Sequence, residues 1–194
     1  MTSEGYEAFD DPYLYKGTNT LKNRLGLRDP ALLESFELEM TTSRAREPLP
    51  AGRYDPLHHR QVHRHLFQDV YRWAGKYRSV RIAKGRNLFC YPEQIEASMN
   101  RLFDSFHRND CLGAKTAGDF VAGTTEFLGE LNAIHPFREG NGRAQLAFMH
   151  LLGEQAGFPF DFSRVQRQSF LRAMIESFSG NLVLLNKELT RLLA

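Results

Sequence analysis

The sequence predicts an all-α domain that carries one small β-hairpin. Most apolar residues recur at helical spacing, one short segment instead places apolar residues on both sides of a polar turn, and Pro or Gly marks most segment boundaries. The chain has 194 residues, 42% of them hydrophobic, which suits one compact domain with a substantial core. We therefore expect a single domain over residues 1–194.

The first part of the chain predicts an irregular arm followed by two helices. The arm, residues 1–28, is rich in Tyr, Gly, Asn and Asp. Asp-Pro pairs at Asp29 and Asp55 begin the helices, because Pro favours the first helical position. The first helix ends before Pro48. The second has an apolar stripe that ends near Gly75 and comprises Leu57, Val62, Leu66, Val70 and Trp73.

Residues 78–91 predict a hairpin. The polar turn KGRN is flanked there by apolar residues, namely Val80, Ile82, Leu88 and Phe89. Helical spacing returns after Pro92, and it predicts five more helices over about 93–108, 116–134, 142–156, 163–178 and 181–193.

Composition excludes several classes of partner. The formal net charge is +2, with basic and acidic residues interleaved, so we predict no nucleic-acid partner. No apolar run is long enough to cross a bilayer, and the N-terminus lacks the basic and apolar regions of a signal peptide, so we predict no membrane association. The two cysteines, Cys90 and Cys111, cannot build a disulfide framework, which favours a reducing, cytoplasmic setting.

The segment between helices 116–134 and 142–156 reads HPFREGNGR and predicts an anion site. Pro136 ends the preceding helix. Gly140 and Gly142 permit positive φ and close backbone approach. The next helix offers unpaired N–H groups at its start, and Arg143 adds a cation. A triphosphate suits such a site.

Two further side chains of this segment could serve catalysis. Glu139 could hold a Mg²⁺ ion that bridges phosphate oxygens. His135 lies at the loop mouth, where a general base for an incoming hydroxyl belongs. A Gly-Asn-Gly turn is also common between helices, and a His before Pro can be a simple turn residue, so spacing alone leaves both interpretations open.

The same segment resembles the signature of the Fic (filamentation induced by cAMP) family. That signature runs His, any residue, Phe, any residue, Asp or Glu, Gly-Asn-Gly-Arg, two free positions and a second Arg. The stretches DPYLYKGTNTLKNRLGL and VYRWAGKYR and the hairpin with Phe89 are also similar to bacterial Fic toxins, so the resemblance covers nearly the whole chain. It implies a protein adenylyltransferase that moves AMP from Mg²⁺-bound ATP to a Ser, Thr or Tyr hydroxyl.

The resemblance also implies residue roles. His135 would be the catalytic base, Phe137 would anchor the loop in the core, and Glu139 would bind Mg²⁺. Asn141 would bond the α-phosphate, and Arg143 the β- and γ-phosphates. The full set of nucleotide-binding candidates is Lys84, Gly85, Arg138, Gly140, Asn141, Gly142 and Arg143. The hairpin would be a flap that binds the target protein as an added strand, through Arg86, Asn87, Leu88 and Phe89. Lys84 could equally be part of a solvated turn.

One position departs from the signature. Leu146 stands where the family has its second Arg, so a cation that would bind the triphosphate is missing at this position. Two alternatives therefore stay open: a Fic-type phosphotransferase, and a catalytically weak module that binds nucleotide or target. The related Doc toxins transfer the γ-phosphate, but they have Lys where Gly142 stands here. Leu146 could also pack in the core while another basic residue supplies the contact.

Regulation is predicted from a second family motif, in which Ser or Thr is followed by three free residues, Glu, and Gly or Asn. Three Ser-x-x-x-Glu matches begin at Ser3, Ser35 and Ser43, and none is completed by Gly or Asn. We therefore expect a separate small antitoxin protein that supplies the inhibitory helix. The Met start and short length predict a stand-alone toxin in the bacterial cytoplasm, with delivery to another cell as an alternative.

Four histidines cluster on the second predicted helix: His58, His59, His63 and His65. His59 and His63 have the spacing of two metal ligands, but a third ligand and the Glu of a zinc-protease motif are not evident. We expect a solvated or structural helix instead of a zinc site.

Overall fold

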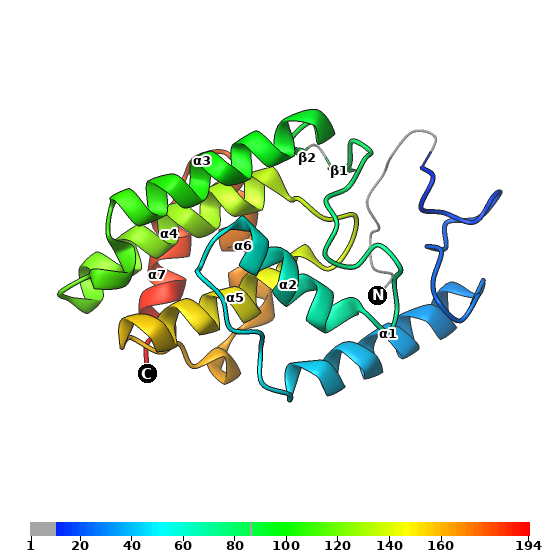
Figure 1. The fold of residues 1–194 in the computed structure, drawn as a ribbon. Helices are drawn as coiled ribbons and strands as arrows, with labels where there is room; N and C mark the ends of the chain where they lie inside the picture. The colour runs from blue at the N-terminus through cyan, green and yellow to red at the C-terminus, as the bar shows by residue number, and fades with distance from the viewer. Residues whose placement is uncertain (1–10, 86) are drawn as a thin grey trace. The chain divides into compact units, whose positions relative to one another are not determined.

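The computed structural model describes residues 11–85 and 87–194 and confirms the predicted fold class (Figure 1). The helices are α1 (Pro30–Ala45), α2 (Pro56–Phe67), α3 (Ile95–Arg108), α4 (Ala117–Ile134), α5 (Asn141–Ala156), α6 (Arg167–Phe178) and α7 (Val183–Leu192). Two short strands, β1 (Ala83–Lys84) and β2 (Asn87–Leu88), form an antiparallel hairpin. Among the described residues, no helix combines the length and the apolar character that a membrane span needs.

The chain forms two compact units. The first comprises the residues up to Glu93 together with Pro136–Ala144, and the second comprises Gln94–His135 and Gln145–Ala194. The glycine-rich segment after His135 thus belongs to the unit built by the N-terminal part of the chain.

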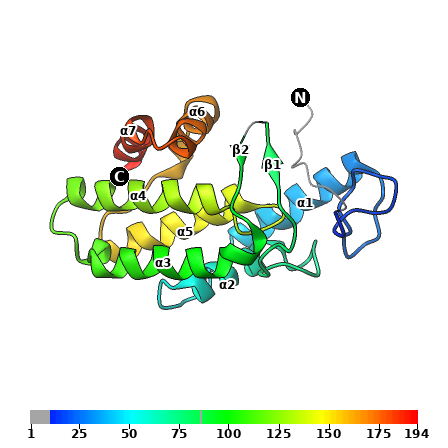
Figure 2. The ribbon, with the colours of Figure 1, turned by 90° about the horizontal axis from the view of Figure 1, so that it is seen from above.

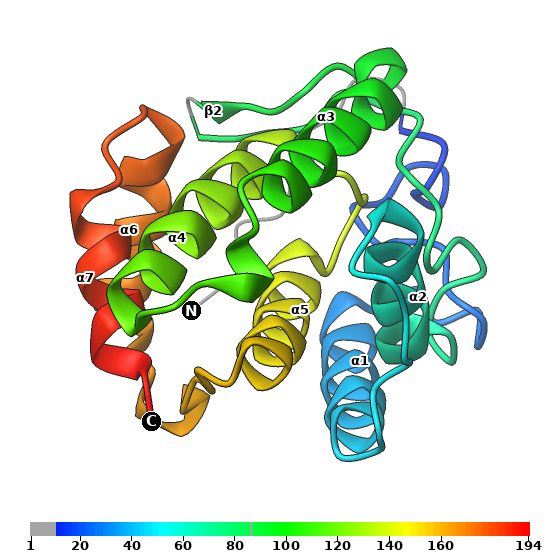
Figure 3. The same ribbon diagram turned by 60° about the vertical axis from the view of Figure 1, so that its left-hand side comes forward.

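In the first unit, α1 and α2 pack side by side (Figure 3). Both begin as predicted. The Asp29 carboxylate accepts hydrogen bonds from the first amides of α1, and the Asp55 carboxylate accepts one from His58 N in α2. These caps satisfy amide groups that have no partner inside the helix. Apolar residues from α2 and the turns after it form the core of this unit, including Val62, Leu66, Phe67 and Val70.

The second helix is shorter than predicted. The stripe that indicated a helix to Gly75 ends at Phe67, and Leu57 is exposed. Val70 and Trp73 follow in turns, whose amides bond to carbonyls three residues back, from Val70 to Phe67 and from Lys76 to Trp73. Helical spacing continued through these turns because their apolar side chains also face the core, so periodicity alone could not mark the helix end.

The predicted hairpin is confirmed, although its strands are only two residues each. The two strands β1 and β2 run side by side (Figure 2), and Ala83 pairs with Leu88 and Lys84 with Asn87. The buried Arg78 guanidinium ties the base of the hairpin together by donating to the carbonyls of Val80 and Cys90 at 2.7 and 2.6 Å. The Arg78 amide donates to the Pro136 carbonyl, so the hairpin base is joined to the glycine-rich segment.

The second unit is a helical cluster. α3 lies along α4, and α6 and α7 pack on each other and on α4 (Figure 2). Phe103 and Phe127 meet edge to face at 5.1 Å, and Phe148 of α5 meets Phe103 at 5.6 Å. α6 begins at Arg167, later than predicted, because a short 3₁₀ turn over Phe162–Arg164 precedes it.

Candidate active site

His63 of α2 supports the backbone of the glycine-rich segment. Its Nδ1 atom accepts a hydrogen bond from Gly75 N at 2.9 Å, and its Nε2 atom lies 3.0 Å from the Glu139 carbonyl oxygen. Since a carbonyl oxygen can only accept, Nε2 carries the proton and the ring is neutral. Burial lowers the pKa of His63 to about 3, which agrees with this state.

Phe137 and Asn141 shape the turn. The Phe137 ring is fully buried and stacks on the His63 ring, with centroids 3.7 Å apart. The Asn141 side chain clasps the Phe137 backbone: its Oδ1 atom accepts from Phe137 N at 2.9 Å, and its Nδ2 atom donates to Phe137 O at 2.8 Å. The turn is therefore held from both sides, by a core aromatic and by the first residue of α5.

Gly140 and Gly142 lie in different steric environments. Gly140 has φ +80°, and a Cβ atom there would lie 2.2 Å from the Phe67 ring, so conformation and packing both require glycine. A Cβ atom at Gly142 would meet no atom within 4 Å. The surrounding protein gives no steric reason for glycine at position 142, which fits a position approached closely by a ligand.

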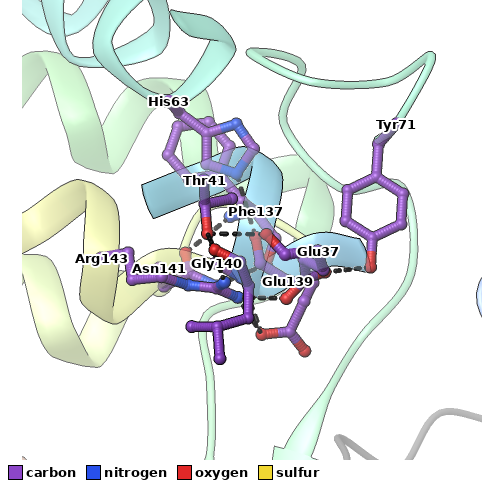
Figure 4. A network of polar contacts seen from close by, with 10 residues as sticks. Glu37, Thr41, His63, Tyr71, Phe137, Glu139, Gly140, Asn141 and Arg143 are labelled. Atoms are coloured by element: carbon purple, nitrogen blue, oxygen red, sulfur yellow. Dashed lines mark hydrogen bonds and ion pairs between the residues drawn. The ribbon is translucent and has the colours of Figure 1, made fainter. Parts of the chain in front are cut away.

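Arg143 lies in the first turn of α5 and contacts α1 (Figure 4). Its NH1 group donates to Thr41 Oγ1 at 3.2 Å, and its NH2 group donates to the Glu37 carboxylate. The guanidinium carbon lies 4.6 Å from the Phe67 ring centroid. The Tyr71 hydroxyl donates to the other oxygen of Glu37. The Arg143 guanidinium, which the sequence predicted as the cation of the anion site, therefore belongs to a hydrogen-bond network with α1 that the sequence did not reveal.

The Glu139 carboxylate fits a divalent cation. Its Oε1 atom accepts from Gly140 N at 2.8 Å and lies 3.9 Å from Arg143 NH2. Burial, and then the nearby Glu37 carboxylate, raise the pKa of Glu139. A half-buried carboxylate whose charge is only partly balanced favours a bound cation, and Mg²⁺ commonly uses one or two carboxylates with substrate phosphates. This donor set suits Mg²⁺.

Arg138 has a different environment from Arg143. Its side chain is 4% exposed and forms an ion pair at 2.6 Å with Asp11, which is 1% exposed. The nucleotide-binding role expected for Arg138 stays a prediction. What the structure shows is that this arginine joins the glycine-rich segment to the N-terminal arm.

His135 ends α4 in the second unit and has left-handed backbone angles, φ 50° and ψ 62°. Such a conformation is uncommon for a residue other than glycine and often occurs at functional sites. The Nδ1 atom lies 3.1 Å from the Asn132 carbonyl oxygen. Nδ1 therefore carries the proton in the neutral ring, and Nε2 is the nitrogen with the basic lone pair.

The flap candidates differ in exposure. Leu88 is exposed, whereas Phe89 is buried and its amide donates to the Ile82 carbonyl. Gly85, with φ +59°, makes the turn between Lys84 and Asn87. Arg86 lies outside the described residues. Target binding by these residues stays a prediction.

The histidine cluster on α2 is structural, which is the second of the two expected descriptions of this helix. His58, His59 and His63 are buried. His58 Nε2 bonds to the Pro50 carbonyl, and His65 Nε2 to the Arg44 carbonyl. Within residues 11–85 and 87–194, no group of three or more His, Cys, Asp or Glu side chains is placed to hold a metal ion.

The buried histidines predict acid sensitivity. Burial lowers the pKa values of His59 and His63 to about 3, whereas both rings titrate near 6.5 in the unfolded chain. The unfolded state binds more protons between these values, so stability should fall as the pH drops below about 6.5, by up to about 1.4 kcal/mol per pH unit for each ring. Urea unfolding at pH 7.5, 6.5 and 5.5 measures this slope. His63→Gln should reduce the slope, whereas the exposed-site variant His107→Gln should retain it; equal slopes in all three proteins would contradict the assignment.

Several supporting residues were not predicted as part of the site, among them Asp11, Glu37 and Thr41. Glu37 and Thr41 are four residues apart, so they share one face of α1, and that spacing was the available signal. Asp11 opens the stretch DPYLYKG that carried part of the family resemblance.

Comparison with known proteins identifies the family. The Fic/DOC family model matches residues 54–152. Probable protein adenylyltransferase y4lH of Sinorhizobium fredii is 49% identical over 189 residues, which cover 97% of this chain and 98% of the relative. Protein adenylyltransferase VbhT of Bartonella schoenbuchensis is 40% identical over 91% of this chain and 37% of its own length.

A solved structure has the same fold. The BepC effector of Bartonella tribocorum, determined with bound AMPPNP, superposes with a TM-score of 0.84 at 28% identity and covers 94% of this chain and 96% of that chain. Together with the motif geometry, these matches show that the chain belongs to the Fic/DOC family.

Proposed function

We propose that this protein is an adenylyltransferase that transfers AMP from Mg²⁺-bound ATP to a Ser, Thr or Tyr hydroxyl of a target protein. The observation that carries the proposal is the HPFREGNGR segment, in which a histidine with its basic lone pair on Nε2 precedes an anion-binding helix start. The relatives named as protein adenylyltransferases and the AMPPNP-bound BepC structure support the same chemistry.

Each group has a role in the proposed reaction. His135 takes the proton from the target hydroxyl, which attacks the α-phosphorus while pyrophosphate leaves. The Gly142 amide and the second N–H of the Asn141 side chain face the phosphates, and the Gly140 amide, which donates to Glu139 Oε1, orients that carboxylate beside them. Arg143 holds the β- and γ-phosphates. Glu139 would hold the Mg²⁺ ion, which neutralises phosphate charge when bound.

The proposed partners follow from the same assignment. The target segment adds a strand to the hairpin, a mode that uses main-chain hydrogen bonds and makes little demand on sequence. Leu88 offers an exposed apolar contact there. A toxin role, restrained by a separate antitoxin helix, is the regulatory part of the proposal.

Labelled ATP tests the reaction. Cell lysate incubated with the protein and Mg²⁺-ATP should take up label from the α-phosphate and not from the γ-phosphate, and modified proteins should gain the mass of AMP. Uptake of γ-label would identify a phosphotransferase. Binding of nucleotide without transfer of either label would identify the weak binding module that Leu146 leaves open.

Leu146 gives a second, quantitative test. It lies three residues after Arg143 on α5, hence on the same face, and its side chain is half-buried. A hydrogen bond to a charged group contributes about 1.5–3 kcal/mol, or about 10- to 150-fold. We expect Leu146→Arg to raise kcat/KM for ATP by about tenfold or more. Leu146→Met, which adds no donor, is the control. A folded Leu146→Arg protein without any gain would show that another group already supplies the contact.

A further inference from the structure

The guanidinium of Arg143 is constrained on three sides. Thr41 and Glu37 of α1 accept hydrogen bonds from its two terminal nitrogens, and the Phe67 ring of α2 lies against it. An arginine side chain has about 2 kcal/mol of rotamer entropy to lose, so an unconstrained one pays that cost when a ligand binds. Here the protein has already ordered the side chain.

Glu37 is itself held in place. Its Oε2 atom accepts from the Tyr71 hydroxyl, and the buried Tyr71 ring stacks on Trp73 with centroids 4.3 Å apart. Burial and the Glu37 charge raise the pKa of Tyr71, so its hydroxyl keeps the proton that it donates. Tyr71, Glu37 and Arg143 thus form a chain from the core to the glycine-rich segment.

The outer end of this chain remains available to an anion. The Arg143 side chain is 38% exposed, whereas that of Glu37 is 12% exposed. A guanidinium has five N–H donors, and the hydrogen bonds to Thr41 and Glu37 use one on each terminal nitrogen. Within the described residues no other hydrogen bond of Arg143 is made, so three of its donors remain unused.

We propose that Glu37 and Tyr71 are positioning residues that orient Arg143 for the β- and γ-phosphates of ATP. Glu37 is an anion and cannot bind phosphate itself, so its effect passes through Arg143. Tyr71 acts one step further away, through Glu37. This inference rests on the proposed function and extends it to two residues outside the HPFREGNGR segment.

Calorimetric titration with two probes tests the proposal: AMPPNP with Mg²⁺, which carries a phosphate tail, and AMP, which lacks the β- and γ-phosphates. Glu37→Gln keeps the side-chain volume and removes the charge. It should weaken AMPPNP binding by about 10- to 100-fold, the scale of losses caused by misplaced binding groups. AMP affinity should change by less than about twofold. Tyr71→Phe, which removes only the hydroxyl, should have a smaller effect in the same direction.

Two comparisons separate positioning from a structural role. Glu39→Gln changes an exposed carboxylate on the same helix and should leave both affinities unchanged. The double variant Glu37→Gln/Tyr71→Phe should bind AMPPNP no more weakly than Glu37→Gln alone, because Tyr71 acts through Glu37. Additive losses, or equal losses for AMPPNP and AMP, would overturn the proposal.

The outcomes also separate this inference from the proposed function. Tighter AMPPNP binding in Glu37→Gln would mean that Glu37 competes with phosphate for Arg143. That result would reject the positioning role and leave the proposed function untouched. If the Glu37→Gln and Tyr71→Phe variants have a lower Tm but unchanged affinities for AMPPNP and AMP, Glu37 stabilises the fold and does not position Arg143. A wild-type protein that binds neither AMPPNP nor AMP would reject the proposed function and this inference with it.

Discussion

Replacing His135 with alanine should abolish transfer of AMP while leaving nucleotide binding largely intact. The hydrogen bond from Nδ1 to the Asn132 carbonyl assigns the basic lone pair to Nε2, which can accept the proton of an attacking hydroxyl. Removing a general base costs about 10²–10⁴-fold in rate. Turnover with α-labelled ATP and the Kd for Mg²⁺-AMPPNP, measured on the same preparation, separate chemistry from binding.

His150→Ala serves as the control, because His150 is an exposed histidine on α5 and should have wild-type turnover when replaced. If His135→Ala transfers AMP at a near-normal rate, the base lies elsewhere. If instead both rate and AMPPNP affinity collapse, the left-handed residue at the end of α4 shapes the loop and the assignment as base is unsupported.

Asp11→Asn should strongly destabilise the first unit. The Asp11–Arg138 pair is almost completely buried, and breaking a buried ion pair by removing one partner costs about 3–5 kcal/mol. Urea unfolding at pH 7.5 measures the loss. The double variant Asp11→Asn/Arg138→Gln removes both charges of the pair and should recover part of the stability.

Asp29→Asn is the matched control, since asparagine also caps a helix well and Asp29 lies at the exposed start of α1. It should cost less than about 1 kcal/mol. An Asp11→Asn protein as stable as this control would show that the Asp11–Arg138 pair contributes little to the stability of the first unit.

The helical elements were predictable where local signals decide them. Asp29 and Asp55 cap helices because a short carboxylate followed by Pro suffices, and α4 could be placed from its own apolar spacing. The end of α2 was not predictable, since the turns after Phe67 also bury apolar side chains. A periodic apolar pattern indicates which residues face the core, but it does not show directly where the helical hydrogen bonds end.

The sequence predicted the site residues within the HPFREGNGR segment, but it did not predict the distant residues that hold this segment in place. The HPFREGNGR pattern indicated a base, an acidic metal ligand and an anion-binding cation within nine consecutive residues. The burial of His63 and the pairing of Arg143 with Glu37 depend on residues far away in the sequence, which local spacing does not reveal. A family resemblance identifies conserved chemistry by its motif, whereas tertiary contacts determine how that motif is held.

The contacts that hold the glycine-rich segment span 76 residues to His63, 106 to Glu37 and 127 to Asp11. Closing such long stretches of chain costs entropy before the contacts form, and contacts of this kind slow folding. During synthesis at roughly 5–20 residues per second, α1 and α2 leave the ribosome several seconds before Arg138 does. We therefore expect a nascent chain to carry these helices without a formed phosphate-binding loop, so that nucleotide binding begins only after most of the protein has been made.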